Sequence, residues 1–162
     1  GAEIWTSDGS EGGTRRVAGI TGSVPRAPVE RFDPFGNRVV FKLGSCNPFG
    51  GVPTQPLWLA DGEAARLLSE ETCVGAEMAD LGDRLLFISS GAAGGELWST
   101  DGTAAGTRLV VDLAGRAASG ARRVGDHALF LTYDARLNGR LWRSDGTAAG
   151  TAVVAEIERG QG

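Results

Sequence analysis

The sequence is built on a tandem repeat, and this feature limits the possible folds more than any other. Three copies read GAEIWTSDGSEGGTRRVAGI from Gly1, GELWSTDGTAAGTRLVVDL from Gly95 and GRLWRSDGTAAGTAVVAEI from Gly139. A shorter copy, QPLWLADGEAARLL, begins at Gln55. Each copy holds one tryptophan, and these are Trp5, Trp58, Trp98 and Trp142. Their spacings of 53, 40 and 44 residues set a unit of roughly 45 residues.

A second motif recurs between the copies. It reads FGNRVVF at Phe35–Phe41, LGDRLLF at Leu81–Phe87 and VGDHALF at Val124–Phe130. Each instance has a glycine, a polar pair, two apolar residues and a phenylalanine, as expected for a turn that leads into a buried strand. Every unit therefore carries the same two motifs in the same order.

The last unit divides into four short strands separated by turn residues. These strands are predicted at Ala121–Val124, His127–Tyr133, Arg140–Ser144 and Thr151–Ile157. No window of 11 residues or more keeps a helical apolar period without a glycine. Four strands in a unit of this length are typical of a propeller blade.

We therefore predict an all-β fold, a β-propeller-like array of four-stranded antiparallel blades, about three and a half units long. The predicted units are residues 1–20, which form a half unit, and residues 28–72, 76–113 and 121–157. The 162 residues are expected to be a single repeat domain or a fragment of a longer propeller.

Charge and hydropathy exclude two classes of partner. The net charge is −4 and the calculated pI is near 5.0, without the basic face that a nucleic-acid partner requires. No apolar stretch approaches the roughly 20 residues of a membrane-spanning helix. We therefore expect neither a nucleic-acid partner nor a membrane span.

The repeat resembles the bacterial ELW-x-x-DGT tandem-repeat family of surface and secreted proteins. The match is closest at Glu96-Leu97-Trp98 with Asp101-Gly102-Thr103, and it recurs at Leu141-Trp142 with Asp145-Gly146-Thr147. The resemblance covers essentially the whole chain. It implies a propeller-like fold, a secreted or cell-surface location outside the cytoplasm and no catalytic activity.

The recurring tryptophans are predicted to be structural. One large aromatic residue per unit suits the space between neighbouring blades, and the flanking Leu or Ile favours a core position. The alternative is an exposed ring of tryptophans that stacks on sugars. The core interpretation is the stronger one because the recurrence is so regular.

The aspartates of the repeat are predicted to shape turns. Asp-Gly is a strong turn signal, since Gly adopts positive φ and the Asp side chain bonds nearby N–H groups. These residues are Asp8, Asp61, Asp101 and Asp145. The alternative is a calcium site at Asp8, Asp101 and Asp145, but one carboxylate per loop falls short of the six to eight oxygens that calcium takes. We expect no cofactor.

Catalytic candidates are weak. His127 is the only histidine, and it aligns with Arg38 and Arg84 in the other units. Its presence is explained by a position at the start of a strand, where polar residues are usual. Glu70 and Glu71 are adjacent on an extended segment and would point to opposite faces. We therefore predict that the chain is not an enzyme.

The most distinct departure from the repeat is an insertion, GSCNPFGGVPTQ, from Gly44 to Gln55. Insertions in repeat proteins form loops on one face, often the binding face. Within it, the candidate ligand-binding residues are Asn47, Phe49, Thr54 and Gln55. The alternative is a surface insertion without a binding role.

The two cysteines are Cys46, in this insertion, and Cys73, after the last strand of the same unit. An even number of cysteines in a secreted chain permits a Cys46–Cys73 disulfide. Such a bond would brace the unit whose turn motif has decayed.

The chain begins inside a unit, so we expect that it does not close into a complete propeller by itself. The first unit lacks two strands, which leaves a fragment of a longer array, an association of two copies or a small wheel with one short blade. The favoured function is a non-catalytic binding or scaffold module of an extracellular bacterial protein, with loops for adhesion or protein contact. The alternative is a carbohydrate-binding propeller, or lectin, so the expected partner is a protein or a glycan at the cell surface.

Overall fold

The computed structural model describes residues 3–20, 29–44, 55–70, 73–91 and 94–158. The described residues form strands and no helices, and all strand pairings within the sheets are antiparallel. The chain divides into two compact units, residues 1–73 and 74–162. The predicted all-β fold built from four-stranded antiparallel sheets is confirmed.

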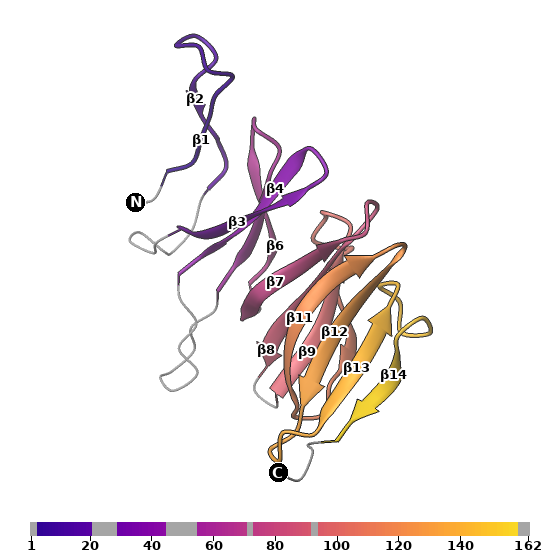
Figure 1. Ribbon diagram of the computed structural model, residues 1–162. Coiled ribbons are helices and arrows are strands. Elements are labelled where there is room, and N and C mark those ends of the chain that lie inside the picture. Colours follow the sequence, from indigo (N-terminus) through magenta and orange to yellow (C-terminus); the bar gives the residue numbers. More distant parts are fainter. Residues whose placement is uncertain (1–2, 21–28, 45–54, 71–72, 92–93, 159–162) are drawn as a thin grey trace. The chain divides into compact units, whose positions relative to one another are not determined.

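The first compact unit holds a hairpin and one four-stranded sheet (Figure 1). The hairpin pairs β1 (Trp5–Thr6) with β2 (Arg15–Arg16). The sheet has the simple order β3-β4-β5-β6. Its strands are β3 (Val29–Phe35), β4 (Arg38–Leu43), β5 (Leu57–Ala60) and β6 (Ala65–Ser69).

The second compact unit holds two four-stranded sheets, each again in sequence order. The first consists of β7 (Val74–Asp80), β8 (Leu85–Gly91), β9 (Gly94–Thr100) and β10 (Arg108–Asp112). The second consists of β11 (Ala117–Val124), β12 (His127–Tyr133), β13 (Gly139–Ser144) and β14 (Ala152–Ile157). We call each four-stranded sheet a blade.

Period-2 burial and tight turns explain the strands. Along β12, Ala128, Phe130 and Thr132 are buried while their neighbours are partly exposed, as alternation in a pleated strand requires. Two-residue turns join β3 to β4 and β11 to β12, and Gly36 and Gly125 adopt φ of 60° and 64° there. Glycine is favoured because such hairpin turns need positive φ.

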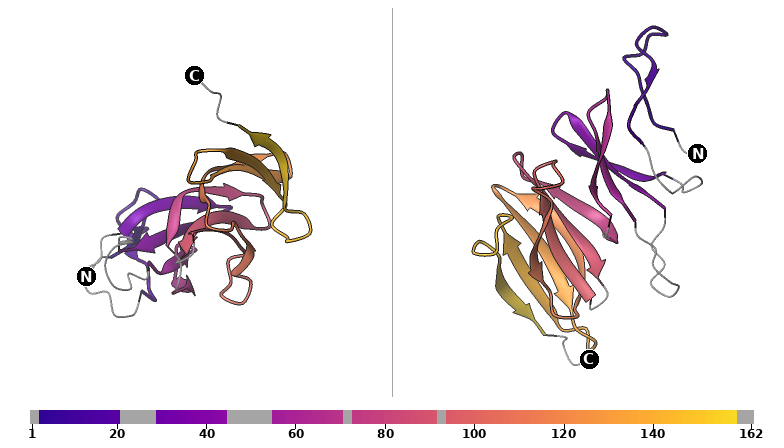
Figure 2. Two further views of the ribbon diagram at one scale, coloured as in Figure 1. Left: turned by 90° about the horizontal axis from the view of Figure 1, so that it is seen from below. Right: turned by 180° about the vertical axis from the view of Figure 1, so that it is seen from behind.

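The core of the second compact unit lies between its two blades, which face one another in both orientations of Figure 2. One blade contributes Leu86, Ile88 and Leu97, and the other contributes Ala128 and Phe130. The Leu of the ELW motif therefore packs against the Phe-bearing strand of the next blade.

The first compact unit repeats this arrangement with its hairpin. Ile4 and Val17 are buried with Phe41 and Trp58 of the blade. Backbone bonds join the hairpin's end to the blade, with Ala65 N donating to Ala18 O at 2.7 Å. Ile4 occupies the position of Leu97 in the repeat. The β1–β2 hairpin therefore packs against the β3–β6 blade through the same repeat position that a full blade uses.

Trp5 departs from the predicted core role, since 58% of its surface is exposed. In the blades, the repeat tryptophan lies opposite a phenylalanine on the adjacent strand. In the described residues, the β1–β2 hairpin has no such strand beside it. The aromatic partner that would bury Trp5 is therefore missing from this sheet.

Candidate functional site

The three DGT or DGS loops share one network of hydrogen bonds. In the loop between β9 and β10, Asp101 Oδ1 accepts bonds from Thr103 N at 2.8 Å and Thr103 Oγ1 at 2.7 Å. Thr103 Oγ1 in turn accepts from Gly106 N at 2.9 Å, and Thr107 Oγ1 donates to Thr103 O at 2.7 Å. The loops that begin at Asp8 and Asp145 repeat these bonds within 0.1 Å.

The geometry explains why the motif is D-G-T-x-x-G-T. Gly102 has a φ of 91°, which favours glycine. A Cβ on Gly106 would lie 2.1 Å from the Asp101 carboxylate, so only glycine fits beside it. Thr100 and Thr107 close the loop through their hydroxyls, 2.7 Å apart. The motif residues thus bond to one another within the loop.

The same bonds lower the pKa of the carboxyls. The side-chain hydrogen bond from Thr103, followed by its backbone N–H, holds the pKa of Asp101 below its usual value. Thr147 does the same to the pKa of Asp145, and Ser10 to the pKa of Asp8. Bonds that favour the charged form act in this direction. No group of three or more His, Cys, Asp or Glu residues in the described residues could hold a metal.

The fourth loop, between β5 and β6, keeps only part of this network. Asp61 Oδ1 accepts bonds from Glu63 N at 3.1 Å and Ala64 N at 3.0 Å. Gly62 keeps a φ of 91°. The backbone N–H of Ala64, followed by that of Glu63, lowers the pKa of Asp61. The Asp-Gly turn thus persists where the Thr hydroxyls are absent.

The two sequence motifs of each blade meet as a cross-strand aromatic pair. Phe41 lies opposite Trp58, Phe87 opposite Trp98 and Phe130 opposite Trp142. The rings are stacked in all three pairs, with centroids 6.4, 6.4 and 5.8 Å apart. Each blade tryptophan is therefore paired with a phenylalanine ring in a near-parallel, offset arrangement.

The insertion is closed at its base. Gln55 is 2% exposed, and its Nε2 donates to Gly44 O at 2.6 Å. Leu43 N donates to Pro56 O at 3.3 Å. The amide of Gln55, a predicted ligand contact, therefore bonds to the backbone at the start of the insertion. The other three candidates, Asn47, Phe49 and Thr54, lie outside the described residues.

Cys73 is disulfide-bonded. Its predicted partner, Cys46, lies outside the described residues, so the Cys46–Cys73 pairing stays a prediction. Cys73 directly precedes β7, at the end of the first compact unit.

The weak catalytic candidates lie apart from any reactive arrangement in the described residues. His127 begins β12, and its Nδ1 pairs with the exposed carboxylate of the adjacent Asp126. Glu70 is exposed, and Glu71 lies outside the described residues. The described part of the chain contains no helix of the length and hydropathy needed to cross a bilayer.

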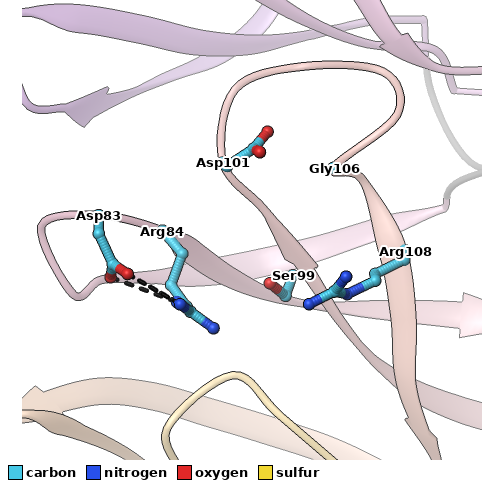
Figure 3. A pocket seen from close by; sticks show the side chains of 6 residues that line it. All are labelled: Asp83, Arg84, Ser99, Asp101, Gly106 and Arg108. Atoms are coloured by element: carbon cyan, nitrogen blue, oxygen red, sulfur yellow. Dashed lines mark hydrogen bonds and ion pairs between the residues drawn. The ribbon is translucent and has the colours of Figure 1, made fainter.

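The most distinctive hollow is a pocket of about 290 Å³ in the second compact unit (Figure 3). It lies between the β7–β8 turn and the β9–β10 loop. Its lining is Asp83, Arg84, Ser99, Asp101, Gly106 and Arg108. Of these, only Asp101 was a candidate site residue from the sequence. Asp83 and Arg84 belong to the LGDRLLF motif and Gly106 to the DGT loop, whereas Ser99 and Arg108 belong to no motif that predicted a binding role. We call it the Arg84–Arg108 pocket.

The strand register shows that this combination of side chains is special to one blade. Ser99 pairs with Arg108, whereas the equivalent pairs in the other two blades are Leu59 with Arg66 and Arg143 with Ala152. The hairpin has Thr6 opposite Arg15, whose guanidinium lies 3.7 Å from Glu63. An alignment of the repeat units that also paired their predicted strands would have placed Ser99 opposite Arg108 and so indicated this pocket.

The fold has clear relatives among solved structures. The chain is similar to the β-propeller domain of the Trilobed protease from Pyrococcus furiosus (TM-score 0.58, 12% identity, 83% of this chain and 43% of that one). It is also similar to uncomplexed Pyrococcus horikoshii acylaminoacyl peptidase (0.56, 15%, 98% and 24%). A chain of a nidogen/laminin complex matches as well (0.51, 16%, 93% and 55%).

These similarities show the β-propeller fold. The chain spans between about a fifth and about half of the length of the similar structures, from 20% to 55%. No protein-family model and no curated protein matches the sequence.

Proposed function

We propose that the chain is a non-catalytic propeller module that binds a protein partner at the surface of a bacterial cell. The observation that carries this proposal is the self-contained bonding of the repeat motif. Each DGT loop satisfies its own carboxylate and hydroxyls, and each blade tryptophan stacks on a phenylalanine. The repeated residues therefore serve the scaffold, and the residues that vary between units remain for contact.

Two further observations support it. The similar structures include a protease propeller domain and a chain of a nidogen/laminin complex, so propellers of this kind occur within larger assemblies. The disulfide at Cys73 suits an oxidising compartment, which agrees with a secreted or cell-surface location.

The insertion is the proposed contact region. Its two described ends are held together, because Gln55 Nε2 donates to Gly44 O at 2.6 Å. Short loops on a rigid scaffold are a common way to build a binding surface.

A crosslinking experiment on the producing bacterium tests this proposal. The purified chain, carrying a photoreactive label, is applied to intact cells, and the crosslinked proteins are identified by mass spectrometry. We expect one dominant protein partner, lost in a chain with Asn47→Ala, Phe49→Ala and Thr54→Ala together. A matched control replaces Ala104 and Ala105 of a DGT loop with serine and should keep the crosslink.

A glycan array run in parallel separates the alternative. Saturable binding of the chain to one glycan class, without a protein crosslink, would replace this proposal with the lectin hypothesis. An unchanged crosslink in the triple variant would refute the insertion as the contact region.

A further inference from the structure

The Arg84–Arg108 pocket contains donors that the protein itself does not use. Ser99 is 3% exposed and lines the pocket, yet its hydroxyl makes no hydrogen bond within the described residues. The guanidinium of Arg108 makes no hydrogen bond or ion pair there either. The Ser99 hydroxyl is not among the fully buried unsatisfied atoms of the described residues, so it reaches the pocket and is available to donate to a bound group.

The two arginines approach this hydroxyl from opposite sides (Figure 3). Arg84 lies in the β7–β8 turn, directly before β8, and Arg108 begins β10, and both guanidinium groups point toward Ser99. Like charges that converge repel one another unless an anion lies between them.

The carboxylates of the pocket do not fill that position. Asp83 Oδ2 accepts a bond from Arg84 Nη2 at 2.8 Å, on the far side of Arg84 from Ser99. Asp101 points away from the arginines, and its Oδ1 is held by Thr103. The charge of Arg108 is therefore left without a hydrogen-bonded counterion in the described residues.

We propose that the Arg84–Arg108 pocket binds the oxyanion group of a small molecule, a carboxylate, phosphate or sulfate. Arginine suits this role because its planar fork donates two parallel bonds to such a group. The Ser99 hydroxyl donates a third bond from the pocket floor. At about 290 Å³ the pocket exceeds the size of a bare anion and has room for a sugar-sized molecule that carries the group.

The other blades provide internal controls, because their register is the same and their side chains are not. At the position of Ser99, the first compact unit has Leu59, and Arg66 opposite it already faces Asp61 at 3.6 Å. At the position of Arg108, the last blade has Ala152. The site is therefore expected once in the described residues.

The test is an NMR titration of the 162-residue chain with sulfate, phosphate and glucuronate at constant ionic strength. We expect saturable shifts of the backbone amides around Ser99 and Arg108. Arg108→Gln should weaken binding about tenfold or more, as loss of a charge-assisted bond does. Ser99→Ala should weaken binding about threefold through loss of one neutral bond. Arg66→Gln, the matched control, should leave the affinity unchanged, and thermal unfolding checks that each variant folds.

Each probe result has a defined meaning. Saturation by sulfate or phosphate supports a tetrahedral oxyanion site, and saturation by glucuronate alone supports a carboxylate site. The absence of saturation with all three probes overturns the proposal. Equal loss of affinity in Arg66→Gln and Arg108→Gln also overturns it, since it would show non-specific charge attraction.

Discussion

The blade of the first compact unit and the β7–β10 blade show what the repeat needs and what it can lose. Both keep the stacked Phe–Trp pair, with centroids 6.4 Å apart in each. Only the second keeps the complete loop network, because Glu63 stands where Thr103 stands in the repeat. The aromatic pair is therefore common to both blades, whereas the complete loop network is not.

The indole N–H groups show a second difference. Trp98 Nε1 donates to Glu96 at 2.9 Å, two residues earlier on the same strand. Trp142 has Arg140 at that position and donates to Thr132 at 3.0 Å instead. In the blade of Trp58, Pro56 stands where Glu96 stands and Leu43 stands where Thr132 stands. Neither side chain can accept a hydrogen bond, and the buried Nε1 of Trp58 has no partner among the described residues. Loss of the motif glutamate thus leaves a donor unsatisfied unless a neighbouring strand supplies the acceptor.

The aromatic pair should carry the largest effect in both regions. Phe41→Ala and Phe130→Ala each remove a fully buried ring, and each should lower the free energy of unfolding by about 3–5 kcal/mol. Chemical denaturation followed by tryptophan fluorescence measures this. Trp5→Ala is the control, since its exposed ring should contribute less than about 1 kcal/mol. Similar losses of unfolding free energy in Trp5→Ala and Phe130→Ala would contradict the larger contribution expected of the buried aromatic pair.

The loop network should carry a smaller effect, limited to the complete loops. Thr103→Ala removes the hydroxyl that bonds to Asp101 and Gly106, and should cost about 1–2 kcal/mol of unfolding free energy. Glu63→Thr in the decayed loop should change stability by less than about 0.5 kcal/mol, because Asp61 is present but the shorter loop lacks counterparts of Gly106 and Thr107. Urea unfolding curves check both. A gain of stability in Glu63→Thr as large as the loss in Thr103→Ala would contradict the distinction.

A single substitution should reproduce the unsatisfied indole in an intact blade. Thr132→Val keeps the shape of a fully buried side chain and removes the acceptor of Trp142. We expect a loss of about 1 kcal/mol, the net value of a hydrogen bond in a partly buried site. Thermal unfolding measures it, and the indole N–H resonance of Trp142 should shift. A shift of that resonance with no loss of stability would mean that water replaces the threonine.

The smallest effect should appear at acid pH. Hydrogen bonds from Thr103 and Thr147 lower the pKa of Asp101 and Asp145 in the folded chain. Their stabilising contribution is therefore present above the unfolded pKa, near pH 3.9, and is lost as the pH falls through the lower folded value. Carboxyl NMR titration should give midpoints below 3.8 for both. Thr103→Ala should raise the midpoint of Asp101 alone, and equal midpoints in the two chains would refute the cause.

The repeat, the all-β class and the division of each unit into four antiparallel strands could be predicted from the sequence. A turn pair such as Gly125–Asp126 and the spacing of Phe130 from Trp142 are local features, because strand period and turn geometry depend on adjacent residues. The Asp-Gly turns were also predictable, since the carboxylate bonds to N–H groups within three residues.

The contacts between side chains on different strands could not be predicted in this way. The exposure of Trp5 reflects the lack, in the described residues, of a strand beside the β1–β2 hairpin, and the unsatisfied Nε1 of Trp58 depends on Leu43, 15 residues away along the chain. The convergence of Arg84 and Arg108 on Ser99 arises from three strands whose register is set by hydrogen bonds across the sheet. Neither composition nor periodicity encodes such pairings, because each residue's partner depends on how whole strands align.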